Sequence, residues 1–316
     1  MSAPFVTIAG GVGAARFLSG LLQVAPPTSC TAIVNVGDDV ELHGLWVSPD
    51  LDTVTYTLAG AIDPERGWGL AGETWNAMDA LGRYGGITWF NLGDRDLATH
   101  LYRTQRRREG AALGEVTGEI VRAWGLELRV LPVTDDRVET RVTLADTGEE
   151  VNFQEYFVKH HHGVPVQAVR FAGARDARPG PGVLDAVTGA ATVVIAPSNP
   201  LVSIAPVLAV PGVRDAIAAR RAHTVAVSPI VGGAALKGPA DRMLVELGHE
   251  SSVLGVARLY VDLASVLVID EVDAEHADAV EALGLRCVVT DTIMKSPERA
   301  ASLARAVLAA VPSGGS

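Results

Sequence analysis

Short apolar runs recur along the chain, and each ends in a polar turn or in one that contains glycine or proline. Most runs precede a stretch of helical periodicity, such as the one in which Phe17, Leu18 and Leu21 share a face. This alternation predicts an α/β fold, a doubly wound and mostly parallel Rossmann-like sheet whose strands are buried on both faces. The expected strands cover residues 5–9, 31–35, 191–196, 223–227, 265–269 and 286–290.

Residues 136–188 depart from this rhythm. Positions 140–152 alternate like a β-hairpin with Gly148 near its turn, and positions 175–182 are rich in proline and glycine. We therefore expect a smaller inserted α/β lobe at 136–188, within a Rossmann-like core formed by 1–135 and 189–316. A helix is expected at 297–311, before a short Pro-Ser-Gly-Gly-Ser tail.

Charge and length limit the classes of partner. The chain has 316 residues, of which 48% are hydrophobic, so it is long enough for one large domain with an insertion. Its net charge of −11 argues against nucleic acid and against an anionic membrane surface, and favours a small-molecule ligand. Two isolated cysteines, Cys30 and Cys287, fit a reducing cytoplasm, and we expect neither a signal peptide nor a membrane-spanning helix.

A glycine-rich loop, Gly10-Gly-Val-Gly-Ala-Ala-Arg16, joins the first strand to a helix. Glycines at such a turn let the backbone approach a phosphate, and the free N–H groups of the helix attract the negative charge. Gly11 and Gly13 fit the dinucleotide fingerprint, but Arg16 stands where the third glycine belongs. The alternative is a tight turn without a ligand.

Carboxylates accumulate after the second strand. Between Arg16 and Arg66 the chain has seven acidic residues and no basic one. Repulsion among converging carboxylates is relieved by protons or by a cation, and oxygen ligands favour Mg²⁺. The candidate ligands are Asp38, Asp39, Asp50 and Asp52; the last two would point the same way in an extended segment. The alternatives are acids that cap helices and turns, or Asp38 alone on a ribose.

A third candidate is the run Asp94-Arg95-Asp96, which leads from an aromatic pair into a helix. Arg95 is predicted to pair with Asp50 or Asp52, or to grip a polar edge of a ligand. The alternative is that Asp94 caps the helix and the charges are solvated.

Two later loops follow strands and would meet at the same sheet edge. One offers Ser198 and Asn199 to a base or ribose, and the other places Gly232 and Gly233 near Lys237, a cradle suited to a diphosphate. Tryptophans 46, 68, 75 and 89 either stack on a flat heterocycle or fill the core. We interpret His160–His162 as a surface loop, Arg106–Arg108 as a solvated helix face, and Lys295 as lacking independent support.

Together these motifs resemble the 2-phospho-L-lactate transferase family, CofD. The resemblance spans residue 5 to about residue 305. It is carried, in order, by GGVGAARF, AIVNVGDD, SPDLDTVTYTLAG, GDRDLATH, FQEYFV, APSNP and SPIVGGAALKGPA. The segment IDPERGWGLAGETW is most similar to the actinobacterial phosphoenolpyruvate transferase branch, FbiA.

The resemblance implies an Mg²⁺-dependent transferase of coenzyme F-420 biosynthesis. Such enzymes move a phosphoenolpyruvyl or 2-phospho-L-lactyl group from a guanosine diphosphate ester to the ribityl hydroxyl of the deazaflavin Fo, and release GMP. The family also implies a homodimer, and the isolated cysteines favour a cytoplasmic location. The sequence leaves the choice between the two donors open, although the branch favours phosphoenolpyruvate.

Site residues follow from the same resemblance. The guanosine diphosphate would be held by Gly11, Gly13, Ser198, Asn199, Gly232, Gly233 and Lys237. Asp38, Asp39, Asp50 and Asp52 would serve the metal and the acceptor. Asp50 or Asp52, together with Arg95, would grip Fo, and these three would carry the catalysis.

Two other functions compete with this one. A related group with a similar glycine loop binds nucleotide sugars and regulates without turnover; the segments PDLD, GDRDLATH and FQEYFV argue against it. A nicotinamide dehydrogenase is disfavoured because the glycine fingerprint is incomplete and the acids outnumber the single ribose-binding carboxylate of that fold.

Overall fold

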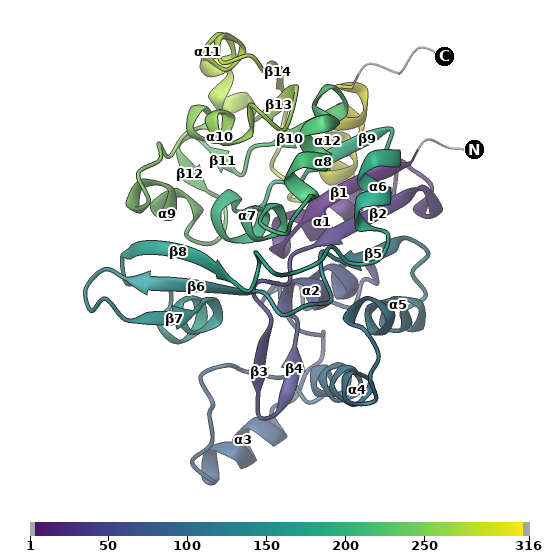
Figure 1. Ribbon diagram of the computed structural model, residues 1–316, viewed down its shortest axis with the longest axis vertical. Helices are drawn as coiled ribbons and strands as arrows, with labels where there is room; N and C mark the ends of the chain where they lie inside the picture. Colours follow the sequence, from purple (N-terminus) through teal and green to yellow (C-terminus); the bar gives the residue numbers. More distant parts are fainter. Residues whose placement is uncertain (1–3, 312–316) are drawn as a thin grey trace.

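A seven-stranded sheet forms the body of the protein (Figure 1). The structure, a computed structural model, describes residues 4–311; the expected tail at 312–316 lies outside that range. All neighbouring strands pair in parallel, in the order β14-β13-β10-β9-β1-β2-β5. The strands are β1 (Phe5–Ala9), β2 (Cys30–Val34), β5 (Arg129–Pro132), β9 (Thr192–Ile195), β10 (Thr224–Val227), β13 (Val266–Ile269) and β14 (Arg286–Val289). The predicted fold class is confirmed.

Six of the seven strands were expected, and β5 was not. It has only four residues, lies at the edge of the sheet and ends in Pro132. Proline removes a ladder donor and is confined to such positions, so the segment lacks the apolar signal of a central strand.

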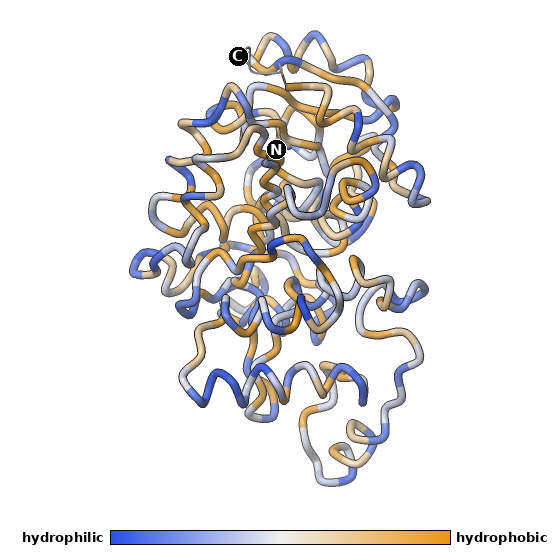
Figure 2. Tube along the Cα trace, turned by 90° about the vertical axis from the view of Figure 1, so that its right-hand side faces the viewer, coloured by the Kyte–Doolittle hydropathy of each residue, from blue (hydrophilic) through white to orange (hydrophobic). Residues whose placement is uncertain are grey.

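Helices cover both faces of the sheet. Gly20 lets α1 approach α12 closely, because a Cβ at this position would lie 2.3 Å from the backbone of Ala300. Figure 2 shows apolar segments running through the body that holds the sheet, with hydrophilic stretches on the outer helices. The helices are α1 (Gly11–Leu21), α2 (Pro49–Leu58), α3 (Asn76–Arg83), α4 (Asp96–Arg108), α5 (Leu113–Ala123), α6 (Val183–Gly189), α7 (Ala205–Leu208), α8 (Val213–Ala219), α9 (Ala240–Glu246), α10 (Val253–Tyr260), α11 (Ala277–Ala282) and α12 (Pro297–Ala309).

The strand order reverses direction at β1. The chain continues from β1 to β2 on one side, and from β9 to β10 and β13 on the other. Ligands of open α/β sheets bind beyond the carboxyl ends of the strands at such a switch point. The two loops at this point touch, since a Cβ on Gly13 would lie 2.2 Å from the carbonyl oxygen of Pro197.

Two smaller units project from the body (Figure 1). One is an antiparallel sheet of β6 (Glu139–Leu144), β7 (Glu150–Asn152) and β8 (Val166–Ala172), in which β6 and β7 form the hairpin expected at 140–152. The other contains the hairpin of β3 (Val40–Leu42) and β4 (Leu45–Val47), which packs against α4 and was not expected from the sequence.

Both cysteines are free thiols; Cys30 is buried and Cys287 is half-buried. Within residues 4–311, none of the helices has by itself the length and apolarity needed to cross a membrane. One pair bent by 93°, Pro200–Leu208 with Val213–Ala219, meets those criteria only as a pair.

Candidate active site

A cavity of about 910 Å³ opens beyond the carboxyl ends of β1, β9 and β10. Its walls come from the glycine loop, α2, the segment 66–69 and the loops after β9 and β10. Most of the predicted site residues line it: Gly11, Gly13, Asp38, Asp50, Asp52, Ser198, Asn199 and Lys237. Asp39, Arg95, Gly232 and Gly233 are not among its lining residues.

The glycine loop and the acidic stretch are joined through Asp50. Gly11 has a φ of 67°. Its backbone N–H donates to Asp50 Oδ1, with 2.9 Å between the nitrogen and the oxygen. Asn35 Nδ2 donates to the other carboxylate oxygen at 2.9 Å. Part of the anion-binding capacity of the α1 N-terminus is therefore used by a carboxylate of the protein itself.

Asp38 and Asp50 face the cavity without a cationic partner among the ion pairs of the described residues. Burial, and then the charge of Asp50, raises the pKa of Asp38 well above its ordinary value. Burial also raises the pKa of Asp50 to about 6, although hydrogen bonds from Asn35 and Gly11 oppose the shift. Asp38 Oδ1 is buried without a hydrogen-bond partner. Buried carboxylates in this state are suited to a proton or a cation.

Asp39 lies behind this pair. Its Oδ2 accepts hydrogen bonds from Trp46 Nε1 at 2.9 Å and from Ser48 Oγ at 2.7 Å. Burial nevertheless raises the pKa of Asp39 to about 7. Asp39 therefore bonds to side chains of the protein and does not line the cavity. The indole N–H of Trp46 is used in this bond.

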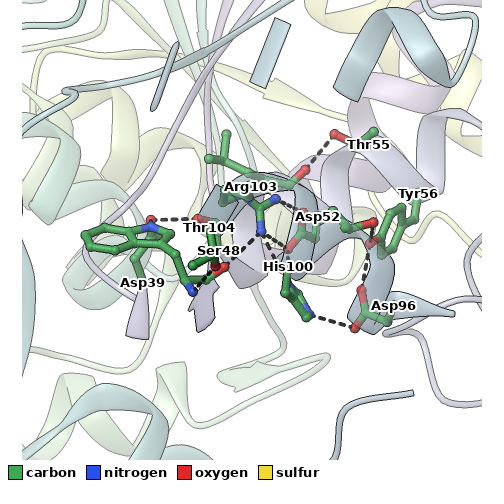
Figure 3. Close-up of polar contacts among 12 residues, drawn as sticks. Asp39, Ser48, Asp52, Thr55, Tyr56, Asp96, His100, Arg103 and Thr104 are labelled. Atoms are coloured by element: carbon green, nitrogen blue, oxygen red, sulfur yellow. Dashed lines mark hydrogen bonds and ion pairs between the residues drawn. The ribbon is translucent and has the colours of Figure 1, made fainter. Parts of the chain in front are cut away.

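The expectation that Asp50 and Asp52 point the same way is wrong. Both lie in the first turn of α2, where residues two apart are separated by roughly 200° around the axis. Asp50 reaches the glycine loop, whereas Asp52 accepts hydrogen bonds from Arg103 of α4 through both oxygens (Figure 3). Arg103 is fully buried and supplies the cation that the neighbouring sequence lacks.

Asp52 belongs to a larger buried network. Arg103 Nη1 lies 3.3 Å from His100 Nδ1, and His100 Nε2 lies 3.2 Å from Asp96 Oδ2. Tyr56 donates to Asp96 Oδ1 at 2.6 Å (Figure 3). No role for Tyr56, His100 or Arg103 was predicted from the sequence. The spacing of Asp96, His100 and Arg103 on one helical face was the available signal.

The predicted pairing of Arg95 with Asp50 or Asp52 is also wrong. Its side chain is exposed, and its Nη1 donates to the carbonyl oxygen of Ala71. Its neighbour Asp94 accepts from the backbone N–H groups of Asn76 and Ala77 at 3.0 Å each. Asp94 therefore caps α3, which precedes it in the chain, and these hydrogen bonds, led by the one from Thr74, lower its pKa.

Gly232 and Gly233 form a hairpin turn between β11 (Ile230–Val231) and β12 (Ala234–Ala235), with φ values of 58° and 79°. The N–H of Gly232 donates to Asp273, at 3.1 and 3.0 Å from its two oxygens. The prediction that Gly232 offers its N–H to a diphosphate is therefore wrong, because Asp273 already accepts from it. Lys237, in contrast, lines the cavity together with Arg16 and Lys295, and burial followed by the charge of Arg16 lowers the pKa of Lys237.

Aromatic rings cover one part of the cavity. Trp68, Trp89 and Phe90 line it, and the guanidinium of Arg66 lies 5.4 Å from the ring centroids of both Trp68 and Trp75. The histidine tract is less peripheral than expected. His161 and His162 line the cavity, and the ring of His162 stacks on Phe157 at a centroid distance of 5.1 Å.

The sequence of the chain matches a known family. The model of the family described as 2-phospho-L-lactate transferase CofD matches residues 5–308. The chain belongs to the CofD family. This CofD protein is 47% identical over 307 residues to the phosphoenolpyruvate transferase of Streptomyces griseus, covering 96% of each chain. It is 41% identical over 315 residues to the one of Mycolicibacterium smegmatis, covering 95% of this chain and 96% of that one. These relatives support a transferase.

Solved structures share the fold. A Bacillus halodurans protein aligns with a TM-score of 0.67 at 19% identity, covering 98% of this CofD protein and all of the other chain. A second structure, titled a member of the upf0052 family from the same organism, aligns with a TM-score of 0.63 at 18% identity. At this identity the likeness concerns the architecture alone.

Proposed function

We propose that this CofD protein transfers a phosphoenolpyruvyl group from a guanosine diphosphate ester to the ribityl hydroxyl of the deazaflavin Fo, in the biosynthesis of coenzyme F-420. GMP is the leaving group. Family membership and relatives called phosphoenolpyruvate transferases support this choice of donor. A 2-phospho-L-lactyl donor is the alternative that the same cavity would admit.

The observation that carries the proposal is the presence of unpaired acids and unpaired cations in the wall of one cavity. Asp38 and Asp50 have no cationic partner, and Arg16, Lys237 and Lys295 take part in none of the ion pairs of residues 4–311. Buried carboxylates without a cationic partner are costly, whereas the three cations are exposed and available to an anionic ligand. A diphosphate with a divalent cation would satisfy both groups at once.

The donor set suits Mg²⁺. Asp38 and Asp50 offer carboxylate oxygens, and Asp38 Oδ1 is buried without a partner. Hard oxygen ligands of this kind, shared with phosphate oxygens, are those that Mg²⁺ prefers. A bound Mg²⁺ would offset the negative charge of the diphosphate. We assign Asp38 and Asp50 to this role, because Arg103 already binds both oxygens of Asp52.

Asp52 is then free to serve the acceptor. A carboxylate has about four lone-pair sites, so Asp52 retains capacity for a hydroxyl while it is bound to Arg103. Since it lines the cavity, we assign it to orienting the ribityl hydroxyl for attack on phosphorus. The flat deazaflavin would pack against Trp89 and Phe90, at the aromatic part of the wall. Holding both reactants in line supplies most of the rate enhancement in such a site.

Incubation with Fo, Mg²⁺ and each guanosine diphosphate ester, followed by mass analysis, tests the proposal. We expect a phosphoenolpyruvyl product and GMP in equal amounts. If only the lactyl ester gave a product, the donor would be the 2-phospho-L-lactyl compound. If the protein bound the nucleotide but formed no product, a regulatory function would be favoured. Asp52→Asn should lower turnover far more than it weakens guanosine diphosphate binding, and unchanged turnover would remove Asp52 from the reaction.

A further inference from the structure

Behind Asp52 lies a chain of buried polar side chains that touch one another in sequence (Figure 3). Arg103 Nη1 lies 3.1 Å from Asp52 Oδ2 and 3.3 Å from His100 Nδ1. His100 Nε2 faces Asp96, and Asp96 accepts from Tyr56. All five side chains are buried, although Asp52, Asp96, His100 and Tyr56 also contribute to the cavity wall.

The position of the histidine proton follows from the donor at its side. Arg103 has only N–H donors and no acceptor, so a ring nitrogen that it contacts must offer a lone pair. In this contact His100 Nδ1 is therefore the acceptor and carries no proton. The single ring proton is then on Nε2, which lies 3.2 Å from Asp96 Oδ2 without meeting hydrogen-bond geometry.

A metal ion is a poor alternative for this cluster. Asp52, Asp96 and His100 could each turn a ligand atom to a common point, since these atoms lie within 4.8 Å of one another. The guanidinium of Arg103 already binds both oxygens of Asp52 and lies next to His100. A divalent ion there would meet a fixed, permanently charged cation.

We propose that His100, neutral and protonated on Nε2, is a positioning residue that orients Arg103 and thereby fixes the carboxylate of Asp52 toward the acceptor. The carboxylate of Asp96 lies 3.2 Å from Nε2, and Tyr56 donates a hydrogen bond to Asp96. Without His100, Nη1 of Arg103 would keep its bond to Asp52 Oδ2 and a 3.4 Å contact with the carbonyl oxygen of Trp46, but its orientation would be less tightly fixed. The acceptor part of this inference rests on the proposed function, whereas the protonation of His100 does not.

Nuclear magnetic resonance of the protein labelled with ¹⁵N-histidine tests the protonation directly. The chain has eight histidines, and His100→Asn identifies the His100 signals by their loss. We expect the shifts of a neutral ring with an unprotonated Nδ1. A proton on Nδ1, or an imidazolium at neutral pH, would overturn the proposal. This measurement needs no substrate, so it stands even if the protein does not use Fo.

Kinetics with Fo test the positioning. His100→Leu removes the acceptor for Arg103 and should raise the KM for Fo about tenfold, the scale of one lost hydrogen bond to a charged group. His100→Asn places an amide oxygen near the Nδ1 position and should restore most of that loss. Binding of guanosine diphosphate should remain unchanged in both variants.

The control is His249→Asn, which changes an exposed histidine far from the network and should match the wild type. Equal KM values for Fo in His100→Leu and the wild type would refute the positioning role. An equal loss of guanosine diphosphate binding would point to a general structural defect instead and would also refute it. Should the leucine variant fail to fold, two measurements still test the proposal. A large rise in the KM for Fo in His100→Asn, or ¹⁵N shifts of a protonated Nδ1, would refute it.

Discussion

Arg103 donates hydrogen bonds to both carboxylate oxygens of Asp52, although the two residues are 51 positions apart in the chain. Their side chains are only 2% and 7% exposed. The pair links α4 to the first turn of α2, which also carries Asp50. One buried ion pair thus joins the unit around β3 and β4 to the wall of the cavity.

Removing the cation of this pair should strongly destabilise the folded protein. Arg103→Met leaves Asp52 buried and uncompensated, which costs about 3–5 kcal/mol of unfolding free energy. Urea denaturation measures the loss. Arg170→Met breaks an exposed ion pair with Glu150 and should cost less than about 1 kcal/mol. Equal effects of the two substitutions would contradict the structural role of the Arg103–Asp52 pair.

The contact between the glycine loop and the loop after β9 can be tested with two glycines. In Gly13→Ala the new Cβ would lie 2.2 Å from the carbonyl oxygen of Pro197, so we expect a loss of about 1–3 kcal/mol or more. In Gly118→Ala, within α5, a Cβ meets nothing within 4 Å, and helix propensity predicts a gain of up to about 1 kcal/mol. Denaturation midpoints should move in opposite directions.

Asp39 makes stability depend on pH. Its pKa rises from 3.8 to about 7 on folding, so the folded state binds the proton more tightly than the unfolded state. The resulting stabilisation is complete below the unfolded value and is lost as the pH rises through about 7. Without metal, the unfolding free energy should fall with rising pH by up to about 1.4 kcal/mol per unit from this group. Denaturation at several pH values measures this slope, and Asp39→Asn should flatten it. If the slope of unfolding free energy against pH were unchanged in Asp39→Asn, other groups would be its cause.

Binding of Mg²⁺ should release protons. Asp50 has a pKa of about 6, and burial raises the pKa of Asp38 well above its ordinary value, so both take up protons more readily than ordinary carboxylates and must lose them to bind a cation. Calorimetric titration of Mg²⁺ with guanosine diphosphate, near pH 6 in two buffers of different ionisation enthalpy, measures the release. Asp38→Asn should abolish most of it, whereas Asp278→Asn, on the exposed side of α11, should not.

The cationic end of the cavity is tested by Lys237. Its ammonium group faces the cavity beside Arg16 and is not paired with a carboxylate among the described ion pairs. Lys237→Ala should weaken guanosine diphosphate binding about tenfold or more, because a charge-assisted hydrogen bond is lost. Lys159→Ala, which removes only a pair with Glu155, is the matched control. Equal affinities of the two variants would remove Lys237 from the nucleotide site.

Much of the site could be located from order along the chain. Residues that directly follow parallel strands meet at one sheet edge, and this rule alone brought Gly11, Asp38 and Ser198 to the same cavity. It failed at Gly232, whose N–H is taken by Asp273, 41 positions later. It also failed at Arg95, expected in a strand-end loop near Asp50 and Asp52, because its side chain donates to the carbonyl oxygen of Ala71 instead.

The sequence by itself determined the periodic apolar runs, and with them the parallel sheet and the loops at its carboxyl edge, because burial on both faces leaves a signal within each short segment. The strand order, and so the switch point at β1, came from the tertiary structure. The sequence did not determine which charges meet. Asp52 and Asp50 diverge because the segment is helical, and Asp52 finds Arg103 only because α4 packs beside α2. Such pairs depend on the packing of distant elements, and only the tertiary structure decides them.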